Sequence, residues 1–180
     1  GGGKSACIFQ IVEKLRESGI PVLAFRLDRV EPVASATLLG EYLGFKESPA
    51  LVLSNSYPGQ QVALVIDQLD YVSTTSGRHP EFFDTVASLR NDVLGLRTRN
   101  RVHFIVACRK FDFEFDHRLK QLTAKDQKPF VLGDFSADEV KAVLLSEGGD
   151  YSKLTAQQQT LLRHPQNLSL FVDAHLANKD

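Results

Sequence analysis

The 180-residue sequence has little net charge, few cysteines and no long apolar run, and each of these absences narrows the possible functions. Its 21 lysines and arginines nearly balance its 22 aspartates and glutamates, which argues against a general nucleic-acid-binding or membrane-surface role. The apolar runs are too short to cross a bilayer, and no signal peptide is recognisable. Cys7 and Cys108, the only cysteines, are expected to be small buried residues in a reducing compartment, the cytoplasm.

The first residues form a pattern that is typical of a phosphate-binding loop. Gly1-Gly2-Gly3-Lys4-Ser5 matches the second half of G-x-x-x-x-G-K-[ST]. Glycines let backbone N–H groups converge on a polyphosphate, and a following helix points its positive end at the same anion. In this motif Lys4 reaches the β- and γ-phosphates, and the Ser5 hydroxyl holds Mg²⁺. The predicted nucleotide-binding residues are Gly1, Gly2, Gly3, Lys4, Ser5 and Ala6.

The residues after the glycines favour this interpretation over a Gly-rich linker that precedes Lys-Ser by chance. Apolar residues recur at helical spacing between Ile8 and Leu15, and Gly19 follows where a helix C-cap glycine belongs. The first glycine of the motif, and the strand that feeds it, would precede residue 1. We therefore expect the chain to belong to a longer protein, whose upstream strand fills a gap between the strand at 102–107 and a strand that ends near Leu132.

A second segment supplies the expected metal carboxylate. Val62-Ala63-Leu64-Val65-Ile66-Asp67 is a continuous apolar run that ends in an acid, as in a parallel strand buried on both faces. Ligands of α/β proteins bind at the carboxyl ends of such strands, so Asp67 is predicted to face Ser5 across Mg²⁺. An acidic turn after an ordinary buried strand is the alternative, but the two motifs together, in this order, favour a P-loop nucleotide-binding domain.

Strand and helix patterns alternate along the chain, which favours a three-layer α/β/α fold with a mainly parallel sheet that lacks its first strand. Strand patterns cover residues 21–27, 62–67, 102–107 and 130–132, and helix patterns cover 35–43, 48–54, 81–94, 155–163 and 165–176, with a capping box at Ser136. A turn at Gly148 predicts the boundary between an αβ core (1–148) and a small helical lid (149–180). Arg97, Arg99 and Arg101 are expected in a solvated loop.

Three further residues are candidates for chemistry. Arg109 follows the strand at 102–107 and is positioned to contact a γ-phosphate, although it is also positioned to pair with Asp112 or Asp116. Asp70 is placed to orient the attacking water or to join the metal shell, or simply to cap a turn. His164, before Pro165, is expected to be a surface or capping residue.

Together these segments resemble the STAND class of P-loop ATPases, relatives of AAA+ and NACHT proteins. The resemblance rests on Gly3-Lys4-Ser5, on the strand ending Val-Ile-Asp67-Gln-Leu-Asp70, on Phe-Ile-Val-Ala-Cys-Arg109, and on Leu-Leu-Arg-His-Pro165-Gln-Asn-Leu, and it spans nearly the whole chain. It implies Asp67 for Mg²⁺, Arg109 as the phosphate-sensing arginine and Pro165 near the adenine. It differs at Tyr71, where NACHT proteins carry an acid, and at Gln68, where many AAA+ ATPases carry a catalytic glutamate.

The resemblance implies a nucleotide switch with ATP and Mg²⁺ as cofactors and with slow hydrolysis. Flanking effector and sensor domains, and a nucleotide-dependent homo-oligomer, would be its partners, with no membrane and no direct nucleic-acid contact. A continuously cycling AAA+ motor or loader that remodels protein or nucleic acid is the alternative; it needs a general base, and only Asp70 is available. A degenerate nucleotide fold used as a scaffold is less favoured, because Lys4, Ser5 and Asp67 are all present.

Overall fold

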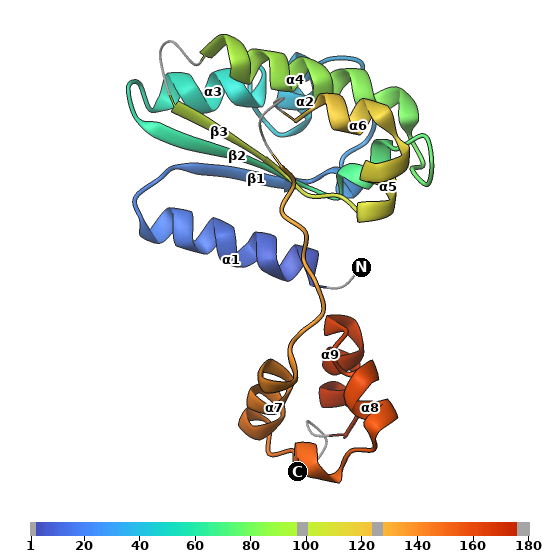
Figure 1. Ribbon diagram of the computed structural model, residues 1–180. Helices are drawn as coiled ribbons and strands as arrows, with labels where there is room; N and C mark the ends of the chain where they lie inside the picture. The colour runs from blue at the N-terminus through green and yellow to red at the C-terminus, as the bar shows by residue number, and fades with distance from the viewer. Residues whose placement is uncertain (1–2, 97–100, 124–127, 176–180) are drawn as a thin grey trace. The chain divides into compact units, whose positions relative to one another are not determined.

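Three apolar segments form a parallel sheet in the order β1-β2-β3 in the computed structural model, which describes residues 3–96, 101–123 and 128–175. The strands are β1 (Val22–Arg26), β2 (Gln61–Asp67) and β3 (Arg101–Val106). Phe25 of β1 lies opposite Ile66 of β2, which in turn lies opposite Val106 of β3. The chain is therefore α/β, and β3, which covers the strand predicted at 102–107, lies directly beside the strand that ends in Asp67 (Figure 1).

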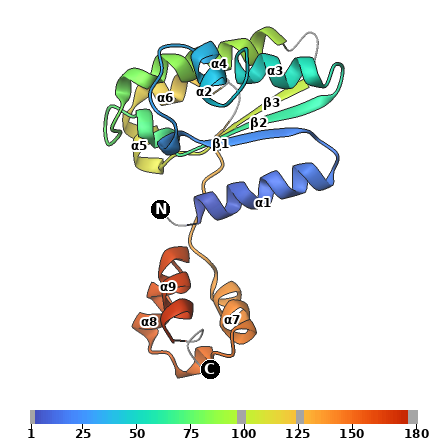
Figure 2. The ribbon, with the colours of Figure 1, turned by 180° about the vertical axis from the view of Figure 1, so that it is seen from behind.

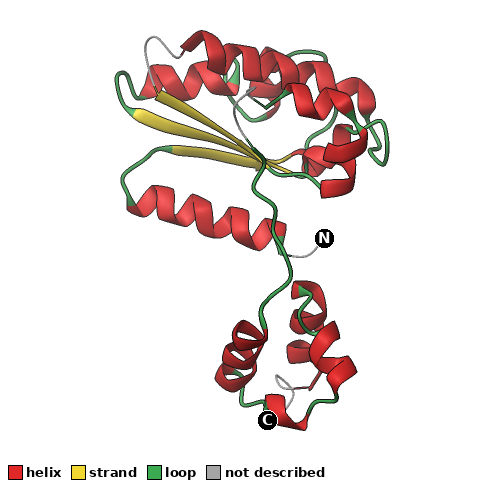
Figure 3. Ribbon diagram, in the orientation of Figure 1, coloured by secondary structure: helices red, strands yellow, loops and turns green. Residues whose placement is uncertain are grey.

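Helices occupy most of the remaining described residues (Figure 3). The α-helices are α1 (Lys4–Glu17), α2 (Ala36–Tyr42), α3 (Pro49–Ser56), α4 (Phe83–Leu96), α5 (Lys110–Phe115), α6 (His117–Gln121), α7 (Ala137–Ser146), α8 (Ala156–Leu161) and α9 (Pro165–His175). Short 3-10 helices, η1 (Leu27–Arg29), η2 (Leu69–Val72), η3 (Pro80–Phe82) and η4 (Tyr151–Lys153), lie between them.

Helices cover both faces of the sheet (Figures 1 and 2). On one face, Val12 of α1 packs on Ala63 and Val65 of β2. On the other face, the larger core joins α2, α3 and α4 to Leu64 and Ile66 of the same strand. Because successive strand residues point to opposite faces, a strand covered on both sides must be apolar throughout. This explains the unbroken apolar run before Asp67.

The carboxyl ends of β2 and β3 are joined by backbone hydrogen bonds. The Ala107 N–H donates to the Ile66 carbonyl at 2.9 Å, and the Leu69 N–H donates back to the Ala107 carbonyl at 2.8 Å. These contacts extend the pairing past the last residue of each strand. The residues that follow the two strands, including Asp70 and Arg109, are thereby held at one edge of the sheet.

The chain divides into two compact units, one of residues 5–129 and one that joins Gly1–Lys4 to Phe130–Asp180. In the second unit, Val140 and Leu144 of α7 share a core with Leu162 and Leu168. The boundary predicted at Gly148 lies inside this unit, because α7 shares this core with the helices that follow it. Capping boxes at Ser136 and Thr155 begin α7 and α8, and the first of these was predicted.

Two other expectations differ from the structure, the strand at 130–132 and the loop position of Arg101. The short strand predicted at 130–132 is wrong, since these residues have no regular secondary structure and Phe130 is 87% exposed. Among the described residues, β3 pairs only with β2. Arg101 begins β3 and is exposed, whereas Arg97 and Arg99 lie outside the described residues, as does Leu176 at the end of the last predicted helix. No described helix is long and apolar enough to cross a membrane.

Candidate phosphate-binding site

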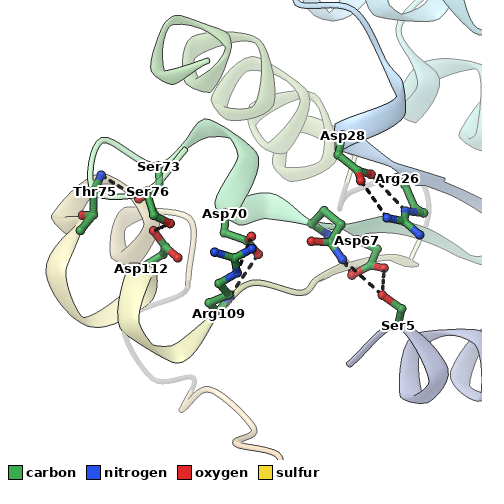
Figure 4. A network of polar contacts seen from close by, with 11 residues as sticks. Ser5, Arg26, Asp28, Asp67, Asp70, Ser73, Thr75, Ser76, Arg109 and Asp112 are labelled. Carbon is green, nitrogen blue, oxygen red and sulfur yellow. Dashed lines mark hydrogen bonds and ion pairs between the residues drawn. The ribbon is translucent and has the colours of Figure 1, made fainter. Parts of the chain in front are cut away.

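Ser5 and Asp67 meet at the carboxyl edge of the sheet (Figure 4). Ser5 lies in the first turn of α1, and Asp67 is the last residue of β2. The Ser5 Oγ donates a hydrogen bond of 2.6 Å to Asp67 Oδ2, between residues that are 62 positions apart in the sequence. Asp67 is only 4% exposed. The predicted proximity of these two oxygen-bearing side chains is confirmed.

Gln68 completes a small ring of hydrogen bonds with the same two residues. Its backbone N–H donates to Asp67 Oδ1 at 2.8 Å, and its side-chain Nε2 donates to Ser5 Oγ at 3.3 Å. Its backbone is left-handed, with φ 61° and ψ 42°. This conformation is uncommon for a residue other than glycine and costs about 1–3 kcal/mol when the surroundings impose it. The ring of Ser5, Asp67 and Gln68 is therefore a locally strained arrangement at the end of β2.

Asp70 and Arg109 form a second pair at the same edge. Arg109 donates to Asp70 twice, from its backbone N–H to Oδ1 and from its Nε to Oδ2, each at 3.2 Å. The Asp70 side chain is 7% exposed, whereas that of Arg109 is 56% exposed. Both Asp70 oxygens are thus engaged by one arginine, whose guanidinium still reaches solvent. Arg109 takes neither alternative partner: Asp112 accepts a hydrogen bond from Ser76, and Asp116 accepts from Arg118.

A third charged pair lies at the end of β1. Arg26 and Asp28 form two side-chain hydrogen bonds, of 3.0 Å and 2.7 Å. The hydrogen bond that Arg26 donates to Asp28 raises the pKa of Arg26, and the negative charges of Asp28 and Asp67 raise it further. Arg26 lies opposite Asp67 in the strand register. The ends of β1, β2 and β3 therefore carry, in order, the Arg26–Asp28 ion pair, the Ser5–Asp67 hydrogen bond and the Asp70–Arg109 ion pair.

The loop after Asp70 is fastened to the helices after Arg109. Asp116, buried at the start of α6, accepts hydrogen bonds from the Thr74 N–H and from the guanidinium of Arg118. Arg118 also donates to the Val72 and Pro80 carbonyls, and its guanidinium lies 4.7 Å above the Phe83 ring. These contacts fix the two segments that carry Asp70 and Arg109 against each other.

The oxygen donors at Ser5 and Asp67 suit a magnesium ion that is shared with a nucleotide. Mg²⁺ prefers hard oxygen ligands and is usually held by one or two carboxylates together with phosphates and waters. Among the described residues, no group of three or more His, Cys, Asp or Glu side chains could hold a metal by itself. The residues thus fit a nucleotide-bound metal, whereas a metal cage built by protein groups alone is not found in the described part of the chain.

The other predicted site residues lie in the glycine segment with the first turn of α1, or at the start of α9. Lys4 begins α1 and is half-buried, and Ala6 is exposed on the same first turn. Gly1 and Gly2 lie outside the described residues. Gly3 has φ 76°, and a Cβ built on it would lie 3.5 Å from the Pro165 Cβ, both residues being in the second unit. The position of Pro165 relative to Asp67 stays a prediction, and His164 is exposed as expected.

Sequence reasoning missed the partners of these residues. The Arg26–Asp28 pair could have been predicted, because Arg26 is a charged residue at the end of a strand. The same pattern pointed to Asp67 and Arg109. The hydrogen bonds from Arg118 to the Pro80 and Val72 carbonyls had no signal, because they join residues that are 38 and 46 positions apart. The chain matches no family model, no curated protein and no solved structure.

Proposed function

We propose that this chain is the ATP-binding switch domain of a multidomain signalling or defence ATPase of the STAND type, acting in the cytoplasm. The observation that carries the proposal is the 2.6 Å hydrogen bond between Ser5, at the start of a helix preceded by glycines, and Asp67, at the end of a buried parallel strand. A hydroxyl and a carboxylate at these two positions are the protein ligands that a nucleotide-bound Mg²⁺ requires in P-loop proteins. The bound metal would neutralise phosphate charge.

Each residue has a defined task in this proposal. Lys4 binds the β- and γ-phosphates as a point charge, together with the backbone N–H groups of Gly1–Ala6. Ser5 and Asp67 hold the metal on one side of the phosphates. Arg109, held by Asp70 through Nε, directs its terminal nitrogens to the γ-phosphate and so distinguishes ATP from ADP. Pro165, in the helical unit, contacts the adenine, and bound Mg–ATP favours an open, oligomer-competent state of the parent protein.

Slow hydrolysis is supported by the state of the two carboxylates. Asp67 accepts hydrogen bonds from Ser5 and from the Gln68 N–H, and both oxygens of Asp70 are taken by Arg109. A general base must be free to accept a proton from the attacking water. Asp67 is assigned to the metal, and Asp70 is buried with Arg109 on both of its oxygens, so an attacking water has little access to it. This favours a switch over a continuously cycling motor or loader.

Calorimetric titration of the full-length protein with Mg–ATP tests the proposal. We expect Lys4→Ala to weaken ATP binding about tenfold to a hundredfold, because one charge-assisted contact contributes roughly 1.5–3 kcal/mol. Lys14→Ala removes an exposed lysine from the same helix and should leave the affinity unchanged. If Lys4→Ala binds ATP as tightly as the wild type, the glycine segment is a linker and the proposal is wrong.

A further inference from the structure

Gln68 has a backbone conformation that its side chain does not favour. It is the only described residue other than glycine with a positive φ. The left-handed turn lets the Gln68 N–H reach Asp67 Oδ1 and lets the Leu69 N–H reach the Ala107 carbonyl. Glycine or asparagine would make the same turn at a lower cost. The turn therefore does not explain why this position carries the long carboxamide side chain of glutamine.

The side chain of Gln68 acts on the Ser5 hydroxyl. A serine hydroxyl has one proton to donate and two lone pairs with which to accept. The Ser5 proton is directed to Asp67 Oδ2, and one lone pair accepts from Gln68 Nε2. With two of its three positions fixed, the hydroxyl has one lone pair left, and the direction of that lone pair is determined. A hydroxyl held by Asp67 alone would keep two open lone pairs, so that a cation or a water could approach it from either direction.

We propose that Gln68 is a positioning residue, which fixes the free lone pair of Ser5 in the direction that a nucleotide-bound divalent cation requires. The inference rests on the proposed function, and it adds that the metal dependence of nucleotide affinity is set by the carboxamide of Gln68. Gln68 contacts neither the nucleotide nor the metal. Its loss weakens the part of the affinity that Mg²⁺ provides and leaves metal-free binding unchanged.

Two variants separate the carboxamide from the turn. Gln68→Asn and Gln68→Gly both adopt the left-handed backbone, but the first has an amide that is one methylene too short to reach Ser5, and the second has none. Gln60→Asn makes the same chemical change at an exposed position and serves as the matched control. ATP affinity is measured by calorimetry on the full-length proteins, once with Mg²⁺ and once with EDTA.

We expect both Gln68 variants to lose about threefold to tenfold in affinity with Mg²⁺, which is what one neutral hydrogen bond is worth. In EDTA they should match the wild type and the Gln60→Asn control. An equal loss in both buffers would reduce Gln68 to a structural role and overturn the inference. Unchanged affinity in both buffers would overturn it as well.

A double-mutant cycle in the ligand-free protein keeps the inference separate from the proposed function. Unfolding of the wild type, Ser5→Ala, Gln68→Asn and the double variant measures the coupling between the two side chains. Additive effects would overturn the inference whatever the nucleotide results. A wild-type protein that binds no ATP in either buffer would contradict the proposed function, and the inference would fail with it even if the cycle showed coupling.

Discussion

At the scale of single residues, every acidic group at the carboxyl edge of the sheet has a specific partner. Asp67 is bonded to Ser5, Asp70 to Arg109 and Asp28 to Arg26. Arg109 is the most exposed of these partners while its acid is buried. A guanidinium bound through Nε leaves its two terminal nitrogens for an oxyanion. Arg109 can therefore bind a phosphate through its terminal nitrogens while its Nε stays paired with Asp70.

Arg109→Ala should reduce the preference for ATP over ADP. The arginine is proposed to contact only the γ-phosphate, so ATP affinity should fall by about tenfold or more while ADP affinity changes little. Competition titrations of the two nucleotides measure the ratio. Arg16→Ala is the comparison, because Arg16 is an exposed arginine that pairs with Glu13 on the surface of α1. Equal losses for ATP and ADP would contradict a γ-phosphate role.

Sequence reasoning identified these residues but not the state in which they are held. Ser5, Asp67, Asp70 and Arg109 could be chosen because strand ends and glycine-rich helix starts have a fixed geometry in α/β proteins. The pairing of Asp70 with Arg109 could not be chosen over Asp112 or Asp116, since those two acids follow Arg109 closely in the sequence whereas Asp70 is 39 positions away. Only the hydrogen bonds that join the ends of β2 and β3 decide it.

At the scale of elements, the loop between η2 and η3 is held on α6 by charge. Burial alone would raise the pKa of Asp116, but hydrogen bonds from the Arg118 side chain and from backbone N–H groups outweigh it and hold that pKa well below its usual range. The unfolded chain therefore takes up this proton at a higher pH than the folded chain does. The stabilisation is present above the unfolded pKa and is lost as the pH falls toward the folded value.

Asp116→Asn should alter stability and its pH dependence together. We expect a loss of about 2 kcal/mol near pH 7, because the buried bond to Arg118 loses its charge. The wild type should lose stability as the pH falls below about 5, and the variant should lose less over the same interval. Denaturant unfolding at several pH values measures both effects. Asp138→Asn, at an exposed acid, should keep the wild-type profile.

Local signals predicted helices better than strands. The capping box at Ser136 lies within four residues and was sufficient to place the start of α7. The apolar triplet at 130–132 was predicted as a strand, but a strand needs a hydrogen-bonded neighbour, and none is present among the described residues. The sequence could not show this, because pairing depends on residues far along the chain.

At the scale of the whole molecule, the two units have separate cores. The larger unit carries Ser5, Asp67, Asp70 and Arg109, while Pro165 belongs to the smaller one. A nucleotide can control the conformation of a protein only if it binds one conformation more tightly than another, which is possible where two units both contact it. The proposal assigns metal binding to Ser5 and Asp67 of the larger unit, whereas Lys4, for the phosphates, and Pro165, for the adenine, belong to the smaller one. Both units should therefore be required for tight ATP binding.

Steady-state ATP turnover of the purified full-length protein tests the central claim most directly. A switch whose carboxylates are already engaged should hydrolyse ATP well below ~1 s⁻¹ without a partner, near the rate of an unassisted GTPase. Asp67→Asn should impair magnesium-dependent binding and whatever turnover exists, because it weakens the metal shell. Turnover at about tens per second without a partner, abolished by Asp70→Asn, would contradict the account and establish Asp70 as the base of a motor.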